Sequence, residues 1–338
     1  MAKKKSEETQ IGNYLIAEKP LEFISTGCKI FDCTVGGGLP LRRISNIVGD
    51  KSSNKTGLVV EVMANFRQKY PQGYIWYHEA ESAFDLDYAH MLGMPDTLAD
   101  GTKDPNIFLI EDVETIEGLK KTIYEAIDKT AKDDIPGLYV LDTLDAIKLD
   151  QHETNEGYDA ARRAGLINSL ITNLAGDIKR ANMHLLVVSQ IRENIGAGLF
   201  SEKYRRSGGK ALDFYASQVV WLAVTEKIKQ VIQGLTLISG IWVKGSVKKN
   251  KVGLPFRQCE FPVIFNYGIH DVWASLEWLK GIKGGLDSLG ISSKEIKSYA
   301  DTIRNNKDVE TKAKIDDLVE KFWKEINDEF LPTIKKYN

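Results

Sequence analysis

The stretch Ile44 to Asn65, ISNIVGDKSSNKTGLVVEVMAN, decides the fold. An apolar run is followed by a loop of small polar residues and then by a segment compatible with a helix, so the stretch predicts strand, loop and helix. Gly49, Lys55 and Thr56 have the spacing of the pattern G-x-x-x-x-G-K-[ST], whose backbone N–H groups surround phosphate groups. In that pattern the lysine reaches the phosphates and the hydroxyl binds Mg²⁺. The stretch therefore predicts a nucleotide-binding loop, with a surface turn before a helix as the alternative.

One position of the loop departs from the pattern, because Asn54 stands where the second glycine is expected. A position with positive φ excludes most side chains, but Asn enters this region readily. The departure weakens the motif without removing it. We expect the phosphates to lie against the whole loop and its flanking residues: Gly49, Asp50, Lys51, Ser52, Ser53, Asn54, Lys55 and Thr56.

Length and charge limit the classes of protein to which the chain can belong. Its 338 residues suffice for one large α/β domain with an appendage. A charged fraction of 27% and a net charge of −2 exclude a polycation, so any contact with nucleic acid must come from a local cluster. No apolar run approaches the ~18 residues of a membrane span, and we expect an intracellular protein without a membrane partner. Cys28, Cys33 and Cys259 lack metal-ligand spacing and are expected to be reduced, packed thiols.

Short apolar runs and helical patterns alternate along the chain after the loop. The spacing predicts strands at 73–77, 107–112, 137–142 and 184–192, and helices at 115–129 and around 166–174. Such an alternation implies parallel strands joined by right-handed crossovers. The sequence therefore predicts an α/β fold with a mainly parallel, twisted sheet flanked by helices.

Polar residues follow three of these strands. Four acids come after the strand at 73–77: Glu79, Glu81, Asp85 and Asp87. Carboxylates at the end of a strand beside a phosphate loop can orient water on a γ-phosphate, although a solvated loop has the same composition. The run GLYVLD ends in Asp142, which is placed to hold Mg²⁺ through water opposite the loop hydroxyl. Gln190 ends a later strand and suits a hydrogen bond to a γ-phosphate.

The segment from Arg192 to Lys210, RENIGAGLFSEKYRRSGGK, is glycine-rich and too long for an ordinary connection. It carries five basic and two acidic residues, with Phe200 and Tyr204 among them. This composition suits contact with phosphates and stacking against bases, and a flexible surface loop is the equal alternative.

The last sixty residues differ in character from those before them. GIKGGLDSLG has the composition of a linker, and the charged segment from Ser292 to Phe330 is helical in pattern. Its stripe of Leu318, Phe322 and Ile326 is expected to pack within its own small domain. We therefore expect an N-terminal arm at 1–24, a core at 25–278 and a small C-terminal helical domain at 279–338.

Several segments together resemble one family. They are ISTGCKIFDCTVGGGLPLRRI, GDKSSNKT, EAESAFDLDYA, LYVLDTLDAI, SQIRENIG, SGGKALDFYAS and KKNKVGLPFRQCEF, which span roughly residues 14 to 275 in the family's order. The chain is similar to RecA-type homologous-recombination ATPases, as a divergent, bacteriophage-like member. The resemblance implies a RecA-like P-loop ATPase core with ATP and Mg²⁺ as cofactors, acting in the cytoplasm.

The resemblance also implies roles for individual residues. Glu81 corresponds to the carboxylate that activates water, and Gln190 to the γ-phosphate sensor linked to a DNA loop. Tyr88 corresponds to a residue that stacks near the adenine. Lys249 and Lys251 resemble a pair that reaches the nucleotide of the neighbouring subunit. These expectations complete the nucleotide site around Thr56 and Asp142.

Two segments resemble the DNA-binding loops of this family, from Asp150 to about Arg163 and from Ile195 to Gly209. The second has an extra residue near Phe200, which corresponds to an inserted apolar side chain. The expected DNA-binding residues are Arg162, Arg163, Arg192, Phe200, Lys203, Arg205, Arg206, Gly208, Gly209 and Lys210.

The resemblance implies a recombinase that assembles as a helical homo-oligomer on single-stranded DNA and exchanges strands with homologous double-stranded DNA. Two alternatives remain open. A hexameric RecA-fold motor or helicase would use the same core, and a weakly hydrolysing recombination mediator would suit Asn54 and the short N-terminal arm.

Overall fold

The computed structural model describes residues 20–81, 85–98, 100–149, 156–193, 204–206 and 209–332. A large sheet forms its centre, in the strand order β12-β11-β10-β9-β3-β7-β6-β4-β5, with β8 paired to β7. The parallel strands are β3 (Ile44–Gly49), β4 (Tyr74–Glu79), β5 (Ile107–Ile110), β6 (Gly137–Asp142), β7 (Met183–Glu193) and β9 (Gln218–Ile232). The predicted α/β fold with a mainly parallel sheet is confirmed.

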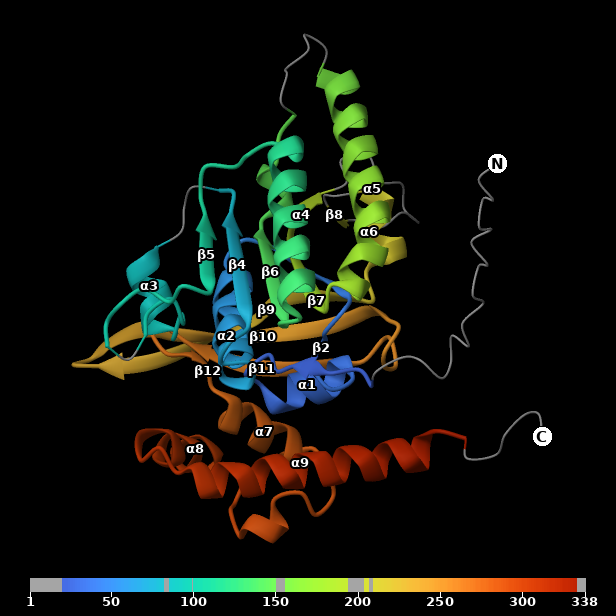
Figure 1. Ribbon diagram of the computed structural model, residues 1–338. Helices are drawn as coiled ribbons and strands as arrows, with labels where there is room; N and C mark the ends of the chain where they lie inside the picture. Colours follow the sequence, from blue (N-terminus) through green and yellow to red (C-terminus); the bar gives the residue numbers. More distant parts are fainter. Residues whose placement is uncertain are drawn as a thin grey trace, which may run out of the picture.

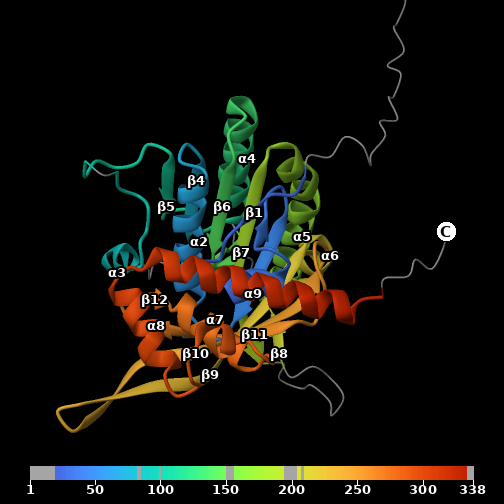
Figure 2. The same cartoon turned by 90° about the horizontal axis from the view of Figure 1, so that it is seen from below.

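Antiparallel strands extend the sheet beyond β9. They are β10 (Leu235–Asn250), β11 (Gln258–Ile264) and β12 (Gly268–Ile269), while β8 (Tyr204–Arg206) pairs antiparallel with β7. A separate pair joins β1 (Phe23–Ile24) to β2 (Leu39–Pro40). The hairpin of β9 and β10 projects from the body in both views (Figures 1 and 2).

Helices cover both faces of the sheet. They are α1 (Lys29–Val35), α2 (Lys55–Lys69), α3 (Leu86–Met91), α4 (Ile116–Asp133), α5 (Glu156–Arg180), α6 (Gly209–Tyr215), α7 (Asp271–Lys280), α8 (Ile296–Asn305) and α9 (Val309–Phe330). The predicted helix after Thr115 is confirmed, because the Thr115 side chain accepts a hydrogen bond from the N–H of Gly118 and so caps α4.

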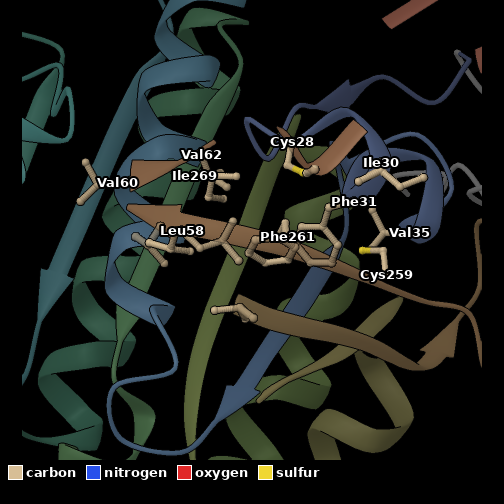
Figure 3. Packing of buried hydrophobic residues seen from close by; sticks show 14 of the residues in the cluster. Cys28, Ile30, Phe31, Val35, Leu58, Val60, Val62, Cys259, Phe261 and Ile269 are labelled. Carbon is tan, nitrogen blue, oxygen red and sulfur yellow. The ribbon is translucent and has the colours of Figure 1, made fainter. Parts of the chain in front are cut away.

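Successive side chains of the central strands point to opposite faces of the sheet and so belong alternately to two hydrophobic clusters. In β4, Ile75 and Tyr77 belong to a first cluster with α1, α2 and the C-terminal helices, whereas Tyr74 and Trp76 belong to a second cluster with α4, α5 and α6. Figure 3 shows part of the first cluster, where Phe31 of α1 lies beside Phe261 of β11 with ring centroids 5.2 Å apart. The sheet therefore separates the two clusters.

The C-terminal helices pack on the core, which differs from the expected packing within a domain of their own. Ile315 and Val319 of α9 are fully buried in the first cluster, with Leu318 and Phe322 packed against it. Ile326 is 40% exposed. Figure 1 shows α7, α8 and α9 beneath the sheet, next to α1. The boundary at residue 279 stays a prediction, as do the limits of the N-terminal arm, of which residues 1–19 lie outside the described part.

The register of the parallel strands brings their carboxyl ends to one edge of the sheet. Gly49 at the end of β3 pairs with Gln190 of β7 on one side and Leu222 of β9 on the other. Glu79 at the end of β4 pairs with Asp142 at the end of β6. Ligands of open α/β sheets bind outside this edge. Among the described residues, no helix is long and apolar enough to cross a membrane.

Candidate functional site

The phosphate loop runs from the end of β3 to the start of α2. Two residues have positive φ, Ser52 at 62° and Asn54 at 63°. Lys55 Nζ donates to the carbonyl oxygen of Asp50 at 2.7 Å, and the Ser53 hydroxyl donates to the same oxygen at 2.8 Å. These bonds fold the loop over itself at the N-terminus of a fifteen-residue helix, where the N–H groups and the helix dipole favour an anion.

Asn54 adopts the left-handed conformation, with φ 63° and ψ 32°. Its amide occupies space beside Gly57, since a Cβ on Gly57 would lie 2.2 Å from Asn54 Oδ1. Gly57, in the first turn of α2, therefore leaves the space that the Asn54 side chain occupies. Asn54 Nδ2 is buried and has no hydrogen-bond partner among the described residues. We call Asn54 and Gly57 the matched pair, because the Asn54 amide occupies the space that a Cβ at position 57 would take.

Thr56 and Asp142, the two residues expected to hold Mg²⁺, are in direct contact. Thr56 Oγ1 donates to Asp142 Oδ2 at 2.8 Å, and the Tyr77 hydroxyl donates to the same oxygen at 3.3 Å. Burial, together with the neighbouring Glu81 carboxylate, raises the pKa of Asp142 to about 6, although the hydrogen bonds from Thr56 and Tyr77 oppose the shift. A hydroxyl and a carboxylate are the oxygen ligands that Mg²⁺ accepts when phosphates and waters complete its octahedron. These two residues fit the expected ion.

Glu81 lies beside this pair. Its Oε1 accepts hydrogen bonds from Thr143 Oγ1 at 2.8 Å and from Gln190 Nε2. The backbone N–H of Gln190 donates to Asp145 Oδ2 at 2.8 Å, which fixes the end of β7. The structure thus brings Glu81 and Gln190, which are far apart in the sequence, into direct contact.

The four acids after β4 have different surroundings. Glu79 is 6% exposed and accepts a hydrogen bond from the N–H of Glu81 at 3.0 Å. Asp85 caps α3 by accepting from the N–H of Tyr88 at 3.0 Å. Asp87 is exposed on α3. Glu81 is therefore the carboxylate among them that is exposed beside Thr56 and Asp142.

A cavity of about 230 Å³ opens over these side chains. Its lining includes Thr56, Tyr77, Glu81, Tyr88 and Asp142. Tyr88, which is half-buried, lies on α3 and lines one side of the cavity. Burial lowers the pKa of Lys55, although nearby carboxylates, with Asp142 first among them, favour its charged form. The cavity therefore combines aromatic side chains with carboxylates at the strand edge, and Lys55 precedes the lining residue Thr56 in the chain.

Lys249 and Lys251 lie outside this cavity. Lys249 Nζ donates to the carbonyl oxygens of Asp213 and Phe214, the latter at 2.9 Å, and Lys251 Nζ donates to Phe214 at 3.0 Å. Both ammonium groups thus bind the carboxyl end of α6, where the helix dipole favours a cation. In a single chain the structure does not bring these lysines to the phosphate loop.

The predicted DNA-binding residues are described only in part. Arg163 is half-buried, and its guanidinium donates to the carbonyl oxygens of Leu144 and Ile147 at 2.7 and 2.6 Å, so it holds the segment after β6. Arg162 is exposed on α5. Phe200, Lys203 and Gly208 lie outside the described residues, and only the backbone is described for Arg192, Arg205, Arg206, Gly209 and Lys210.

Sequence reasoning missed three side chains that organise the site. Thr143 binds Glu81, Tyr77 binds Asp142, and Asp145 binds the backbone of Gln190. Thr143 directly follows a strand-end acid, which is a usable signal in the sequence. Tyr77 sits inside an apolar run, and nothing local distinguishes its hydroxyl from that of a packed tyrosine.

Comparison with known proteins fits this arrangement. A model of the RecA N-terminal domain matches residues 8–270. The RecA protein of Clostridium beijerinckii is 32% identical over 269 residues, which are 78% of this chain and 68% of the relative. The RecA protein of Wolinella succinogenes is 32% identical over 259 residues, with 75% and 69% covered, and that of Nitratiruptor sp. is 33% identical over 253 residues, with 74% and 68% covered. This chain belongs to the RecA family.

Proposed function

We propose that the protein is an ATP-dependent DNA recombinase. It binds ATP and Mg²⁺, assembles as a helical filament on single-stranded DNA and exchanges strands with homologous double-stranded DNA. The observation that supports this most strongly is the contact of Glu81 with Gln190, beside the Thr56–Asp142 pair. A carboxylate for water, a sensor for the γ-phosphate and oxygen ligands for the cation thus lie at one strand edge.

Each residue of this edge has a defined task in hydrolysis. The loop N–H groups from Gly49 to Thr56 bind the phosphates, and Lys55 exchanges its bond to the Asp50 carbonyl for a phosphate oxygen. Thr56 and Asp142 hold Mg²⁺, which neutralises charge on the phosphates. Glu81 accepts a hydrogen bond from the attacking water and orients it.

Gln190 connects the phosphate site to DNA. Its side chain binds Glu81, and β7 continues for three residues beyond it, to Glu193, at the start of the predicted DNA loop. When Gln190 turns to a γ-phosphate, Glu81 is released toward water. A DNA strand bound to the loop can therefore change the orientation of the catalytic carboxylate by moving the end of β7.

A second subunit completes the site through Lys249 and Lys251. Positive charges near a transferring phosphoryl group stabilise its transition state, as an arginine finger does. Both lysines bind the carboxyl end of α6, which begins at Gly209 next to the predicted DNA loop. We therefore expect DNA to influence the position of these lysines toward a neighbour's nucleotide.

The mediator remains the second candidate, and Asn54 is the observation that favours it. A protein whose loop binds ATP but hydrolyses it weakly would regulate a recombinase instead of acting as one. A hexameric motor would use the same strand edge in a closed ring.

ATP hydrolysis measured with and without single-stranded DNA, together with negative-stain images, tests the proposal. We expect helical filaments and hydrolysis stimulated by DNA. Closed rings would indicate the motor. The absence of both filaments and stimulated hydrolysis would indicate the mediator. An assay of strand exchange between a circular single strand and a homologous duplex then tests the recombinase activity directly.

A further inference from the structure

A second, larger cavity of about 500 Å³ adjoins the phosphate loop. Its lining includes Asp50, Lys51 and Ser53 of the loop, with Trp221 of β9 and Lys248 of β10. Trp221 packs against the hydrophobic cluster of α4, α5 and α6. The first cavity contains Tyr77, Ala89 and Leu92, which belong to the opposite cluster. The two cavities therefore share no lining residue, and residues of the loop or of its first helical turn line each of them.

The lining of this second cavity combines an aromatic ring with positive charge. Trp221 is half-buried, and Lys248 Nζ lies 5.5 Å from the centre of its ring. Lys51 and Lys248 are exposed. The Asp50 carboxylate accepts a hydrogen bond from the backbone N–H of Lys51 at 2.7 Å, and the lining contains two lysines and one carboxylate. An indole accepts a stacked base, and lysines bind phosphate, so the cavity suits one nucleotide unit.

We propose that this cavity binds one nucleotide of the single-stranded DNA, with its base on Trp221 and its phosphate near Lys248 and Lys51. The inference rests on the proposed function, and it adds a contact outside the predicted DNA-binding residues. ATP is not the expected occupant, because Thr56 and Asp142 lie in the other cavity.

The position of the cavity along β7 supports a DNA strand as the occupant. Ile191 lines it and directly follows Gln190. Ile191 also pairs with Arg206 of β8, so the cavity adjoins the two paired strands, β7 and β8, that belong to the predicted DNA loop or lead into it. A nucleotide here would contact DNA-loop and phosphate-loop elements at once. The occupied cavity would then fix Asp50, Lys51 and Ser53 and favour one conformation of the phosphate loop.

Photocrosslinking tests the position of the base. Single-stranded oligonucleotides that contain 5-iododeoxyuridine are bound to the full chain with a non-hydrolysable ATP analogue and irradiated, and the crosslinked peptides are mapped by mass spectrometry. We expect a crosslink at Trp221. Labelling of Trp221 by 8-azido-ATP, with no crosslink to DNA, would overturn the proposal and assign the cavity to the cofactor.

Substitutions test the energetics. Trp221→Leu should weaken binding of single-stranded DNA about 5- to 100-fold, while Trp221→Phe should retain most of the affinity, because a ring remains for stacking. Lys248→Gln should lower the slope of log affinity against log salt by about one unit. The matched control, Lys229→Gln on the exposed part of the same hairpin, should leave the slope unchanged.

Binding of a fluorescent ATP analogue and thermal melting are measured for every variant. Unchanged ATP binding and melting, with weaker DNA binding, would support the inference. If Trp221→Leu binds DNA as the wild type does, or if Lys248→Gln weakens only ATP binding, the inference is wrong while the recombinase proposal stands. If the wild-type chain binds no single-stranded DNA with the ATP analogue, both fail.

Discussion

The carboxylates Glu81 and Asp142 differ from the two lysines at the end of β10, Lys249 and Lys251, in where their hydrogen bonds go. Glu81 and Asp142 are bound by Thr56, Thr143 and Gln190, all from the same strand edge. Lys249 and Lys251, in contrast, are bound by backbone carbonyls at the end of α6. The first region is organised within one chain, whereas the second is held away from that chain's own phosphate loop.

Under the proposed function, one chain carries two parts of a site that do not meet within it. Side chains at the ends of parallel strands converge because the register aligns those ends. Lysines on an antiparallel strand have no such constraint, and their position depends on the helix that they bind. A site completed between subunits, as we propose here, would be sensitive to assembly and also to the position of α6.

The largest expected effect comes from the first region alone. Lys55→Ala removes the charge at the β- and γ-phosphates, and we expect ATP hydrolysis to fall about 10³-fold or more, to background. A phosphate-release assay measures it, and Lys121→Ala, an exposed lysine on α4, is the control. Normal hydrolysis by Lys55→Ala would mean that the active site lies elsewhere.

Mixing two inactive variants tests whether the second region acts in another subunit. Lys249→Ala/Lys251→Ala and Glu81→Gln should each lose hydrolysis, by about 10³-fold for a group that acts like an arginine finger. Mixed filaments contain interfaces with Glu81 intact on one side and both lysines intact on the other. Partial activity should therefore return, with a maximum near equal amounts. Co-assembly without recovery at any ratio would show that the lysines do not act between subunits.

A smaller effect concerns the matched pair in the loop. Gly57→Ala places a Cβ against the Asn54 amide, and we expect nucleotide affinity to fall about tenfold. Asn54→Gly should preserve or raise affinity, since glycine adopts the same positive φ.

The double variant Asn54→Gly/Gly57→Ala should recover most of the affinity lost by Gly57→Ala, and titration with a fluorescent ATP analogue measures all four proteins. If the effects of the two substitutions on nucleotide affinity are additive, Asn54 and Gly57 are not coupled. Gly57 would then not explain how the loop accommodates Asn54 in place of the glycine of the pattern.

The last effect is on stability and concerns the helix that supports the first region. Glu61 of α2 accepts a hydrogen bond from the N–H of Ile269 at 2.6 Å, and burial, with Asp271 nearby, raises the pKa of its carboxyl to about 8. An acid whose pKa is higher in the folded state stabilises that state while protonated, and this stability is lost as the pH rises from about 5 through 8. The wild type should therefore lose stability relative to Glu61→Gln by on the order of 4 kcal/mol between pH 5 and pH 9. Urea unfolding at each pH measures this, and parallel curves for the two proteins would contradict the shifted pKa.

Local patterns were enough to predict the α/β class and much of the first region. The run ending in Asp142, the loop from Gly49 to Thr56 and the apolar run before Gln190 are each contiguous in the sequence, although β7 continues beyond Gln190 to Glu193. The periods of strands and helices, and the tolerance of Asn for positive φ at position 54, are properties of short segments. For the same reason the chain's membership of the RecA family could be expected from its motifs.

The sequence by itself determined which residues end the strands, whereas the tertiary structure decided which of them meet. Only the register of β4 beside β6, and the wrapping of the chain that brings Gln190 to Glu81, distinguish Glu81 from the buried Glu79. The bonds of Lys249 to α6 and the cavity over Trp221 likewise join residues from separate elements. Such contacts depend on the packing of the whole chain, because no spacing within a single segment records which distant segment will lie beside it.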